Sequence, residues 1–285
     1  MEKQDVISIV DRYFSNTISN LTKFPIHKLK NDPIENENSF FFLHDFGTYE
    51  LEAKFNYCDG FPQKIALLIH GGNSDLSSLS PLENLLRSKN IGTLSFNLSG
   101  LNNTSETKSS LSQNINESMV FYSLLKKVDI VIGYSLGGYI AINLAKKFQI
   151  DRLILLCPAI YSDQAVKKIY GNEFKDEISK PYSFYSSSIW LFLIEYKREI
   201  TIVYGELDGI KTDNGKSKGF YEMNGITKYS PIPYEIVQTL KKISMRKVNF
   251  NFIIEKDKDH YLLKNIRNYN IQKLIRLDCK RFSSC

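Results

Sequence analysis

Residues 131–138 read VIGYSLGG, a Gly-x-Ser-x-Gly pattern centred on Ser135. The pattern comes at the end of an apolar stretch over residues 128–132 and just before an apolar-periodic stretch over residues 136–148. A strand, a sharp turn and a helix are therefore predicted in that order, with the serine on the turn. The flanking glycines fit this prediction because a strained turn leaves little room for larger side chains. Ser135 is expected to stand exposed above the end of its strand.

Apolar strands and helical stretches alternate on both sides of this turn. The predicted strands cover residues 65–69, 92–96, 128–132, 153–156, 200–204 and 248–254, and the helices cover 79–88, 111–125, 136–148, 234–243 and 262–277. Two earlier strands, over residues 40–43 and 49–57, predict a hairpin around a turn at 45–47. Strands that alternate with helices indicate an α/β fold with a mostly parallel central sheet flanked by helices.

The length of 285 residues fits a single domain over residues 1–285. A segment at about residues 161–198 interrupts the alternation and predicts a small lid, with candidate helices over 163–170 and 187–195. Residues 172–180 have weak periodicity and receive no assignment. A polar insertion at about residues 209–232 also has no assigned role or element, and could border a pocket or form a surface loop.

Composition argues for an ordinary globular protein. The 37 basic and 31 acidic residues leave a net charge of +6, and the lysines are scattered and form no nucleic-acid motif, although a weak attraction to acidic surfaces stays open. The longest apolar run, residues 189–194, is far below the roughly twenty residues of a transmembrane helix. The four cysteines form no Cys-x-x-Cys pair, so we expect reduced thiols, a cytoplasmic location and a buried Cys157.

A serine hydroxyl is a poor nucleophile at neutral pH and needs a base, which in turn needs an orienting partner. Of the four histidines, His260 follows a predicted core strand across a short polar loop, a position from which a base could reach Ser135. His70 lies after another core strand and is interpreted as structural. The alternative interpretations are a glycine-rich turn with an ordinary serine and a solvated loop histidine.

The orienting acid is predicted to be Asp208, which comes directly after the strand over residues 200–204. The chain order Ser135, Asp208, His260 is the order found when a nucleophilic serine sits on a strand-to-helix turn. Glu206 and one of the aspartates at 257 and 259 are the competing acids, and Asp208 could instead cap a turn or helix.

Acyl transfer also requires backbone donors for a developing oxyanion, each worth roughly 3–4 kcal/mol. The amide of Leu136 is one candidate, because it lies at a predicted helix N-terminus. The second is expected in the loop after residues 65–69, which reads HGGNS; we choose the Gly72 amide, with Asn73 as the alternate.

These residues together resemble the α/β-hydrolase superfamily, and within it the esterase, thioesterase and serine-aminopeptidase-like group. The resemblance covers roughly residues 39–277 and rests on His70-Gly71, the GxSxGG of residues 133–138, the GxxD of residues 205–208, and His260. One segment departs from the family pattern, because Asn97 and Ser99 stand where the family's D-x-R-G has aspartate and arginine.

The resemblance implies hydrolysis of a small acyl compound, a carboxylic ester or thioester, through an acyl-enzyme on Ser135, without metal or organic cofactor. Trp190 and Phe192 in the lid could cover an acyl chain, or pack against the core. Peptide or amide hydrolysis and acyl transfer use the same triad and remain alternatives. A non-catalytic ligand-binding module is the alternative from another class. The sequence carries no signal for oligomeric state.

Overall fold

The structure is a computed structural model that describes residues 8, 10–15, 39–57, 64–72, 74–101, 108–210, 219–223 and 225–264. Of residues 219–223 and 226–228 it describes the backbone alone. The cysteines at 58, 279 and 285, Asn73, and residues 265–277 of the predicted last helix lie outside these ranges. No helix among the described residues combines the length and apolar content that a membrane crossing requires.

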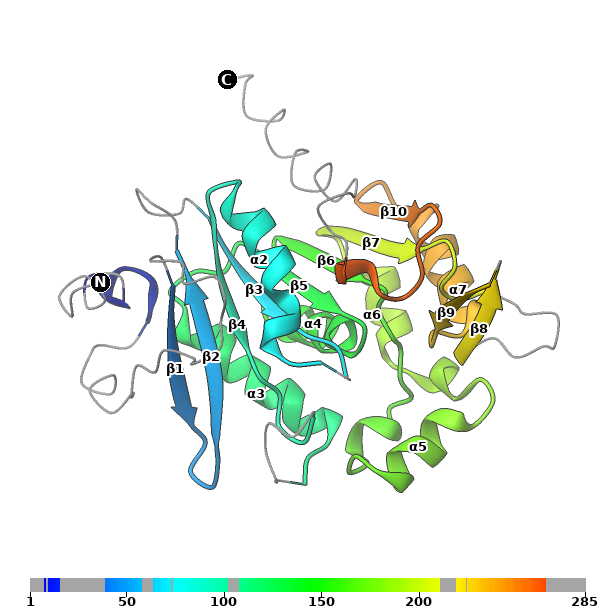
Figure 1. The fold of residues 1–285 in the computed structure, drawn as a ribbon, viewed down its shortest axis with the longest axis horizontal. Helices are drawn as coiled ribbons and strands as arrows, with labels where there is room; N and C mark the ends of the chain where they lie inside the picture. Colours follow the sequence, from blue (N-terminus) through cyan, green and yellow to red (C-terminus); the bar gives the residue numbers. More distant parts are fainter. Residues whose placement is uncertain are drawn as a thin grey trace, which may run out of the picture.

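A central sheet of eight strands runs through the molecule in the order β1-β2-β4-β3-β5-β6-β7-β10 (Figure 1). The strands are β1 (Ser39–Asp45), β2 (Glu50–Asn56), β3 (Lys64–Ile69), β4 (Ile91–Phe96), β5 (Ile130–Tyr134), β6 (Arg152–Leu156), β7 (Glu199–Gly205) and β10 (Phe250–Glu255). β1 and β2 form the predicted hairpin, β2 pairs antiparallel with β4, and every other neighbouring pair is parallel. The prediction of an α/β fold with a mostly parallel sheet is confirmed.

Helices cover both faces of the sheet, with α2 (Ser80–Arg87) on one face and α3 (Leu111–Leu124) and α4 (Leu136–Lys147) on the other (Figure 1). The packing of α4 explains its composition. Tyr139, Ile140, Ile142 and Leu144 are all at most 1% exposed although they point in different directions around the helix. A helix that is apolar all round must be enclosed by other elements; α4 is enclosed by β5, β6, β3, α3 and α6 (Ile189–Glu195).

The order of the strands brings particular loops together. The chain passes from β3 to β4 on one side and then returns to form β5 on the other side of β3. In open α/β sheets the crevice beyond the carboxyl ends of the strands, at such a reversal, is where ligands bind. Here the loops that follow β3 and β5 are the ones that contain His70 and Ser135.

The lid and the insertion differ from the sequence-based expectation. Residues 163–170 were expected to be helical, but only the 3-10 turn η3 (Ala165–Lys167) forms there. A helix that was not predicted, α5 (Asn172–Ser179), follows Gly171, whose φ of +128° allows the chain to turn into it. In the insertion, β8 (Gly219–Met223) and β9 (Ile226–Ser230) pair as an antiparallel hairpin. The helix α7 (Tyr234–Ser244) then returns to the predicted pattern.

A buried ion pair ties α2 to the antiparallel edge of the sheet. The Nζ atom of Lys54, on β2, lies 3.2 Å from Oε2 of Glu83, on α2. Ser95 on β4 donates a hydrogen bond of 2.5 Å to Oε1 of the same carboxylate. Both members of the pair are less than 10% exposed, so neither charge is compensated by bulk water.

We therefore predict that Lys54→Met lowers the free energy of unfolding by about 3–5 kcal/mol, because it leaves the Glu83 carboxylate buried without a countercharge. The double variant Lys54→Met/Glu83→Leu should regain most of that loss, since no buried charge remains. Urea denaturation of the wild type, both single variants and the double variant measures this coupling. Additive losses in the double variant would contradict the assignment.

Candidate active site

Ser135 occupies a strained turn between β5 and α4. Its φ of 54° and ψ of −115° lie in a region that non-glycine residues rarely adopt. Three backbone hydrogen bonds hold the conformation: the Ser135 N–H donates to Leu156 at 2.8 Å, and the Ser135 carbonyl accepts from Gly138 and Ala159 at 3.0 Å each. The side chain is half-buried and faces the pocket described below.

The flanking glycines are required by close backbone contacts, as the sequence predicted. A Cβ atom on Gly133 would lie 2.2 Å from the carbonyl oxygen of Gly137, and one on Gly137 would lie 2.3 Å from that of Ile69. Contacts this short do not occur, so any larger residue would push α4 away from β5 and β3. The glycines thus allow the helix to begin directly above the strand ends.

The structure brings Ser135, His260 and Asp208 together, although 125 and 52 residues separate the bonded pairs along the chain. Nε2 of His260 lies 3.0 Å from Oγ of Ser135, and Nδ1 lies 2.7 Å from Oδ2 of Asp208. Asp208 and His260 are 2% and 4% exposed. Because Nδ1 faces a carboxylate, it carries the ring proton, and Nε2 is left to accept the proton of the serine hydroxyl.

Backbone bonds fix the loop that carries the histidine. The N–H of His260 donates to the carbonyl of Tyr229 at 3.0 Å, and the hydroxyl of Tyr134 donates to the carbonyl of His260 at 2.7 Å. Leu207, beside Asp208, donates its N–H to the carbonyl of Lys258 at 2.7 Å. The loops after β7 and β10 are therefore joined by a backbone hydrogen bond in addition to the side-chain bond between Asp208 and His260.

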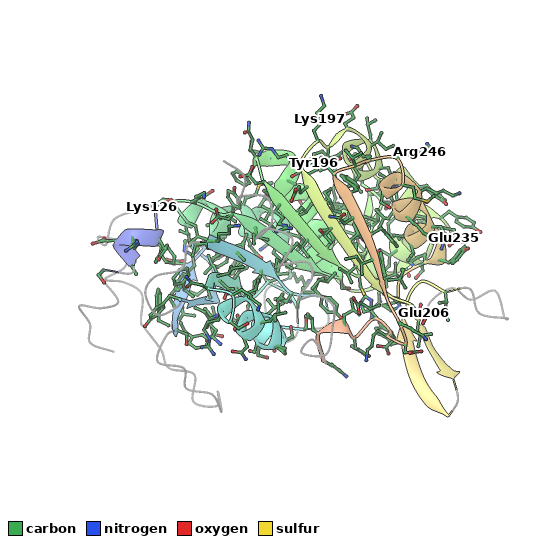
Figure 2. The ribbon with its side chains drawn as sticks, turned by 90° about the horizontal axis from the view of Figure 1, so that it is seen from above. Lys126, Tyr196, Lys197, Glu206, Glu235 and Arg246 are labelled. Carbon is green, nitrogen blue, oxygen red and sulfur yellow. The ribbon has the colours of Figure 1, made fainter. Side chains whose placement is uncertain are left out.

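The competing acids and histidines have other partners. Glu206 is exposed (Figure 2) and accepts the N–H of Asp257 at 3.0 Å. Asp259 accepts backbone N–H groups from Tyr229 and Tyr261. His44 packs against aromatic rings near β1, and His27 lies outside the described residues. Among the described carboxylates, Asp208 is the one bonded to His260.

The expected oxyanion donors lie next to the serine. A Cβ atom on Gly71 would stand 3.3 Å from Cβ of Ser135, and one on Gly72 would stand 3.3 Å from Cδ1 of Leu136. The Leu136 amide belongs to the first turn of α4, where N–H groups have no acceptor within the helix. Both candidate residues also line the pocket. Asn73, the alternate donor, lies outside the described residues.

His70 makes the hydrogen bonds that its structural interpretation requires. The N–H of Leu98 donates to Nε2 at 3.2 Å, so the ring proton sits on Nδ1, which contacts the carbonyl of Gly71 at 2.7 Å. Burial lowers the pKa of His70 from its ordinary 6.5 to about 4, only partly opposed by the bond to Gly71. The neutral ring therefore links the loop after β3 to the loop after β4.

This burial makes the stability depend on pH. The pKa of folded His70, about 4, lies below the ordinary 6.5, so the unfolded chain binds the extra proton first as the pH falls. The contribution of His70 is fully present above pH 6.5 and is lost toward pH 4, by roughly 3 kcal/mol in total. We predict that His70→Gln loses less stability than the wild type between pH 7 and 4.5, as measured by urea denaturation. Equal losses in the two proteins would show that His70 does not titrate in this way.

Cys157 lies beside the triad but is a weak candidate for chemistry. Its sulfur and the ligand atoms of Asp208 and His260 all lie within 4.8 Å of one another, the one such group found among the described residues that could hold a metal ion. Burial, followed by the Asp208 charge, raises the pKa of the thiol well above its ordinary value, so the thiol stays protonated. A metal would need the thiolate and would break the hydrogen bond between Asp208 and His260. We therefore assign no metal to this group.

Asn97 and Ser99, the two residues that depart from the family's D-x-R-G pattern, each hold a loop in place. Oδ1 of Asn97 accepts the N–H of Leu76 at 2.9 Å, which anchors the start of the segment leading to α2. The Ser99 hydroxyl and N–H both donate to the buried carboxylate of Glu117, and Asn114 donates to it at 3.0 Å. The Tyr49 hydroxyl, from the turn between β1 and β2, donates to the same carboxylate at 2.7 Å. Neutral donors from three segments thus satisfy this carboxylate, and the polar network stabilises the loop after β4.

A cavity of about 780 Å³ opens beside Ser135 and His260. Its walls come from the loops after the strands, from the lid and from the end of the insertion. Leucine, isoleucine and aromatic side chains form its bulky lining, and the aromatic ones are Tyr134, Tyr161, Tyr170, Phe174, Phe184, Tyr229 and Tyr261. Sequence reasoning missed these tyrosines, because they come from separate segments of the chain and no local pattern distinguishes them from core residues. For Trp190 and Phe192 the sequence left two interpretations open, and the structure supports the second, because both side chains pack partly buried against the core.

Solved structures share this arrangement of strands and helices. An esterase from Butyrivibrio proteoclasticus, Est1E with ferulic acid bound, matches with a TM-score of 0.58 and 15% identity over 84% of this chain and 99% of that one. A serine hydrolase homologue from Coxiella burnetii matches with a TM-score of 0.53 and 16% identity over 88% and 99% of the two chains. The thioesterase domain from the curacin biosynthetic pathway matches with a TM-score of 0.54 and 14% identity over 82% and 97%. The chain therefore has the α/β-hydrolase fold.

A family model places the chain more narrowly. Residues 66–212, from the β3 strand to just beyond Asp208, match the uncharacterised protein family UPF0227, and the chain belongs to that family. None of the curated protein sequences matches this chain.

Proposed function

We propose that this protein is a serine hydrolase that cleaves a carboxylic ester or thioester through an acyl-enzyme intermediate. The observation that carries the proposal is the continuous line of hydrogen-bonded atoms from Ser135 Oγ through both nitrogens of His260 to Asp208, with separations of 3.0 and 2.7 Å. At its Ser135 end this line reaches a pocket that is large enough for a small acyl compound.

The first half of the reaction follows from this geometry. His260 accepts the hydroxyl proton at Nε2 while Ser135 Oγ attacks the acyl carbonyl carbon. The buried Asp208 carboxylate stabilises the imidazolium that results, and it holds the ring in the required tautomer. His260 then donates the proton to the leaving oxygen or sulfur, which leaves the acyl group bonded to the serine. Water, deprotonated by the same nitrogen, releases the acid in the second half.

The oxyanion formed in each half would be stabilised by the amides of Leu136 and Gly72. The α4 helix dipole adds to the first of these because its N-terminus faces the reacting carbonyl. The rigid packing of Gly133 and Gly137 supports this role, since it holds the N-terminus of α4 at the serine. Donors that are already in place need no reorganisation when the charge develops.

Ester or thioester substrates are favoured by the apolar and aromatic pocket walls, which suit an acyl group better than an extended peptide. Two of the structural neighbours are consistent with this choice, one an esterase with ferulic acid bound and one a thioesterase domain. Acyl transfer and amide hydrolysis use the same triad, but no observation in the pocket favours either.

The central prediction is that Ser135→Ala abolishes turnover, by roughly 10⁴-fold or more in kcat, because no other group can form the acyl-enzyme. Purified protein would be tested on p-nitrophenyl esters and acyl thioesters of increasing chain length. Circular dichroism should show an unchanged fold, since the serine side chain contributes no core packing. Turnover that survives in the variant would reject Ser135 as nucleophile.

Labelling separates catalysis from simple ligand binding. An activated serine should react with a fluorophosphonate in the wild type and not in the Ser135→Ala variant. A wild-type protein that turns over no ester and takes no label would favour the binding-module alternative instead.

We further predict that Asp208→Asn lowers kcat by about 10³–10⁴-fold, because an amide favours the wrong tautomer of His260. Glu206→Gln is the matched control, since it changes an acid two residues away whose carboxylate bonds to the N–H of Asp257 instead of to the imidazole. Steady-state kinetics on the best ester measures both. If Glu206→Gln were the damaging change, the acid would be misassigned.

A further inference from the structure

The charged groups of the pocket are all of one sign. Besides His260, its ionisable wall includes Lys175 and Lys264, and no aspartate or glutamate is among the described residues that line it. Both lysines are exposed, so their ammonium groups are accessible to a ligand in the opening. Charges of one sign at the opening of a cavity raise the local concentration of ligands of the opposite sign.

Lys264 is held on the histidine side of the pocket by a series of ring contacts. Its Nζ atom lies 4.1 Å from the centre of the Tyr261 ring. That ring stacks on Tyr229 with centroids 5.2 Å apart, and Tyr229 meets the His260 ring edge-on at 5.7 Å. The ammonium is thus positioned relative to the general base by rigid aromatic groups, although its side chain reaches into solvent.

Lys175 projects from the lid, on α5. Its neighbour Phe174 packs edge-on against Tyr170 at 5.1 Å and contacts Tyr161 at 5.5 Å, and all three rings line the pocket. The backbone N–H of Lys175 donates to Gly171 at the start of the helix. The first turn of α5 therefore contributes to the pocket both the Phe174 ring and the positive charge of Lys175.

Asp176 directly follows Lys175 in the sequence and is exposed, but it forms no ion pair with that lysine. The other acidic residues close to the two lysines in sequence bond to other groups. Glu173 pairs with Lys168 at 3.6 Å, and Glu177 pairs with Lys180. The two carboxylate oxygens of Asp259 accept the backbone N–H groups of Tyr229 and Tyr261 at 3.2 and 3.0 Å. Within the described residues no carboxylate forms an ion pair with Lys175 or Lys264.

We propose that the pocket binds an acyl substrate that carries an anionic group, a carboxylate or a phosphate, which Lys264 and Lys175 recognise at the opening while the tyrosines hold the uncharged body. This inference rests on the proposed function, because it names the substrate class of the same site. Charge-assisted hydrogen bonds from an ammonium suit both kinds of anion. The Tyr261 and Tyr229 rings place Lys264 on the His260 side of the pocket. Because His260 protonates the leaving group in the proposed mechanism, an anion on the leaving group would contact Lys264.

Binding to the catalytically silent Ser135→Ala protein tests this without requiring turnover. Three thioesters form a matched set: pentanoyl-N-acetylcysteamine is neutral, glutaryl-N-acetylcysteamine carries a carboxylate on the acyl side, and pentanoyl-CoA carries phosphates on the leaving-group side. Isothermal titration calorimetry gives the three Kd values. We expect at least one charged probe to bind roughly tenfold more tightly than the neutral one. The preferred probe identifies which part of the substrate carries the charge.

The lysine variants, made in the same background, show whether the pocket is responsible. Lys264→Gln and Lys175→Gln should each raise the Kd of the preferred charged probe by roughly three- to tenfold and leave the neutral probe unchanged. Lys147→Gln, an exposed lysine at the end of α4 that does not line the pocket, removes the same charge and should change nothing.

Three results would overturn the inference: Kd values that agree within about twofold for all three probes, a charge preference that survives the Lys175→Gln/Lys264→Gln double variant, or an equal effect of Lys147→Gln. The last would attribute the preference to the net charge of the protein. A failed hydrolase proposal would show as absent turnover and labelling of the wild type, and the binding preference is measured independently of both.

Discussion

The strained backbone at Ser135 is the constraint on which the rest of the site depends. A φ of 54° at a non-glycine residue costs of order 1–3 kcal/mol, and it persists only where surrounding contacts determine it. Here the carbonyl of Leu156 accepts the Ser135 N–H, and two amides bond to the Ser135 carbonyl. The strain places the side chain above the sheet and starts α4 at the same point. One turn therefore positions both the Ser135 hydroxyl and the N-terminus of α4, the two groups to which the proposed mechanism assigns attack and oxyanion binding.

The loop after β3 must approach this turn closely, and a neutral histidine is what allows it. A charged ring at position 70 would lose its hydration, a cost that the Asp75 charge opposes only in part, whereas the neutral ring can donate to Gly71 and accept from Leu98 at the same time. The buried carboxylate of Glu117, on α3, holds the loop after β4 in a similar way, because it accepts hydrogen bonds from Ser99 in that loop as well as from Asn114 and Tyr49. The loops that frame the serine are thus joined by polar side chains that point inward.

Much of this architecture could be predicted from the sequence because it is encoded locally. Apolar runs separated by helical periods determine the parallel sheet, and the crowding around residue 135 leaves a recognisable pair of glycines. Ser135, Asp208 and His260 each follow a parallel strand, and the carboxyl ends of parallel strands meet at one edge of the sheet, so their proximity could be predicted. The lid was not predictable in the same way. Helix α5 buries only Phe174 and Glu177, which leaves little apolar periodicity to recognise. The positive φ of Gly171 turns the chain into the helix, and the Phe174 ring packs on Tyr170 and Tyr161. The β8–β9 hairpin lies in a polar stretch that gives no alternation to read.

The tyrosines of the pocket show where local reasoning ends and tertiary structure begins. Tyr161 comes from the lid, Tyr229 from the hairpin and Tyr261 from the loop that contains His260, and only the folded chain makes them neighbours. The segments that were hardest to predict are therefore the ones that shape the cavity, whereas the predictable sheet supplies the groups to which we assign the reaction. This division has a physical cause. The reacting groups need rigid supports of regular structure, whose patterns are strong. A binding wall needs only side chains of suitable size and charge at its inner surface, and many backbone paths can deliver them. Chains with the same sheet and the same serine turn can accordingly differ widely in the compound they accept.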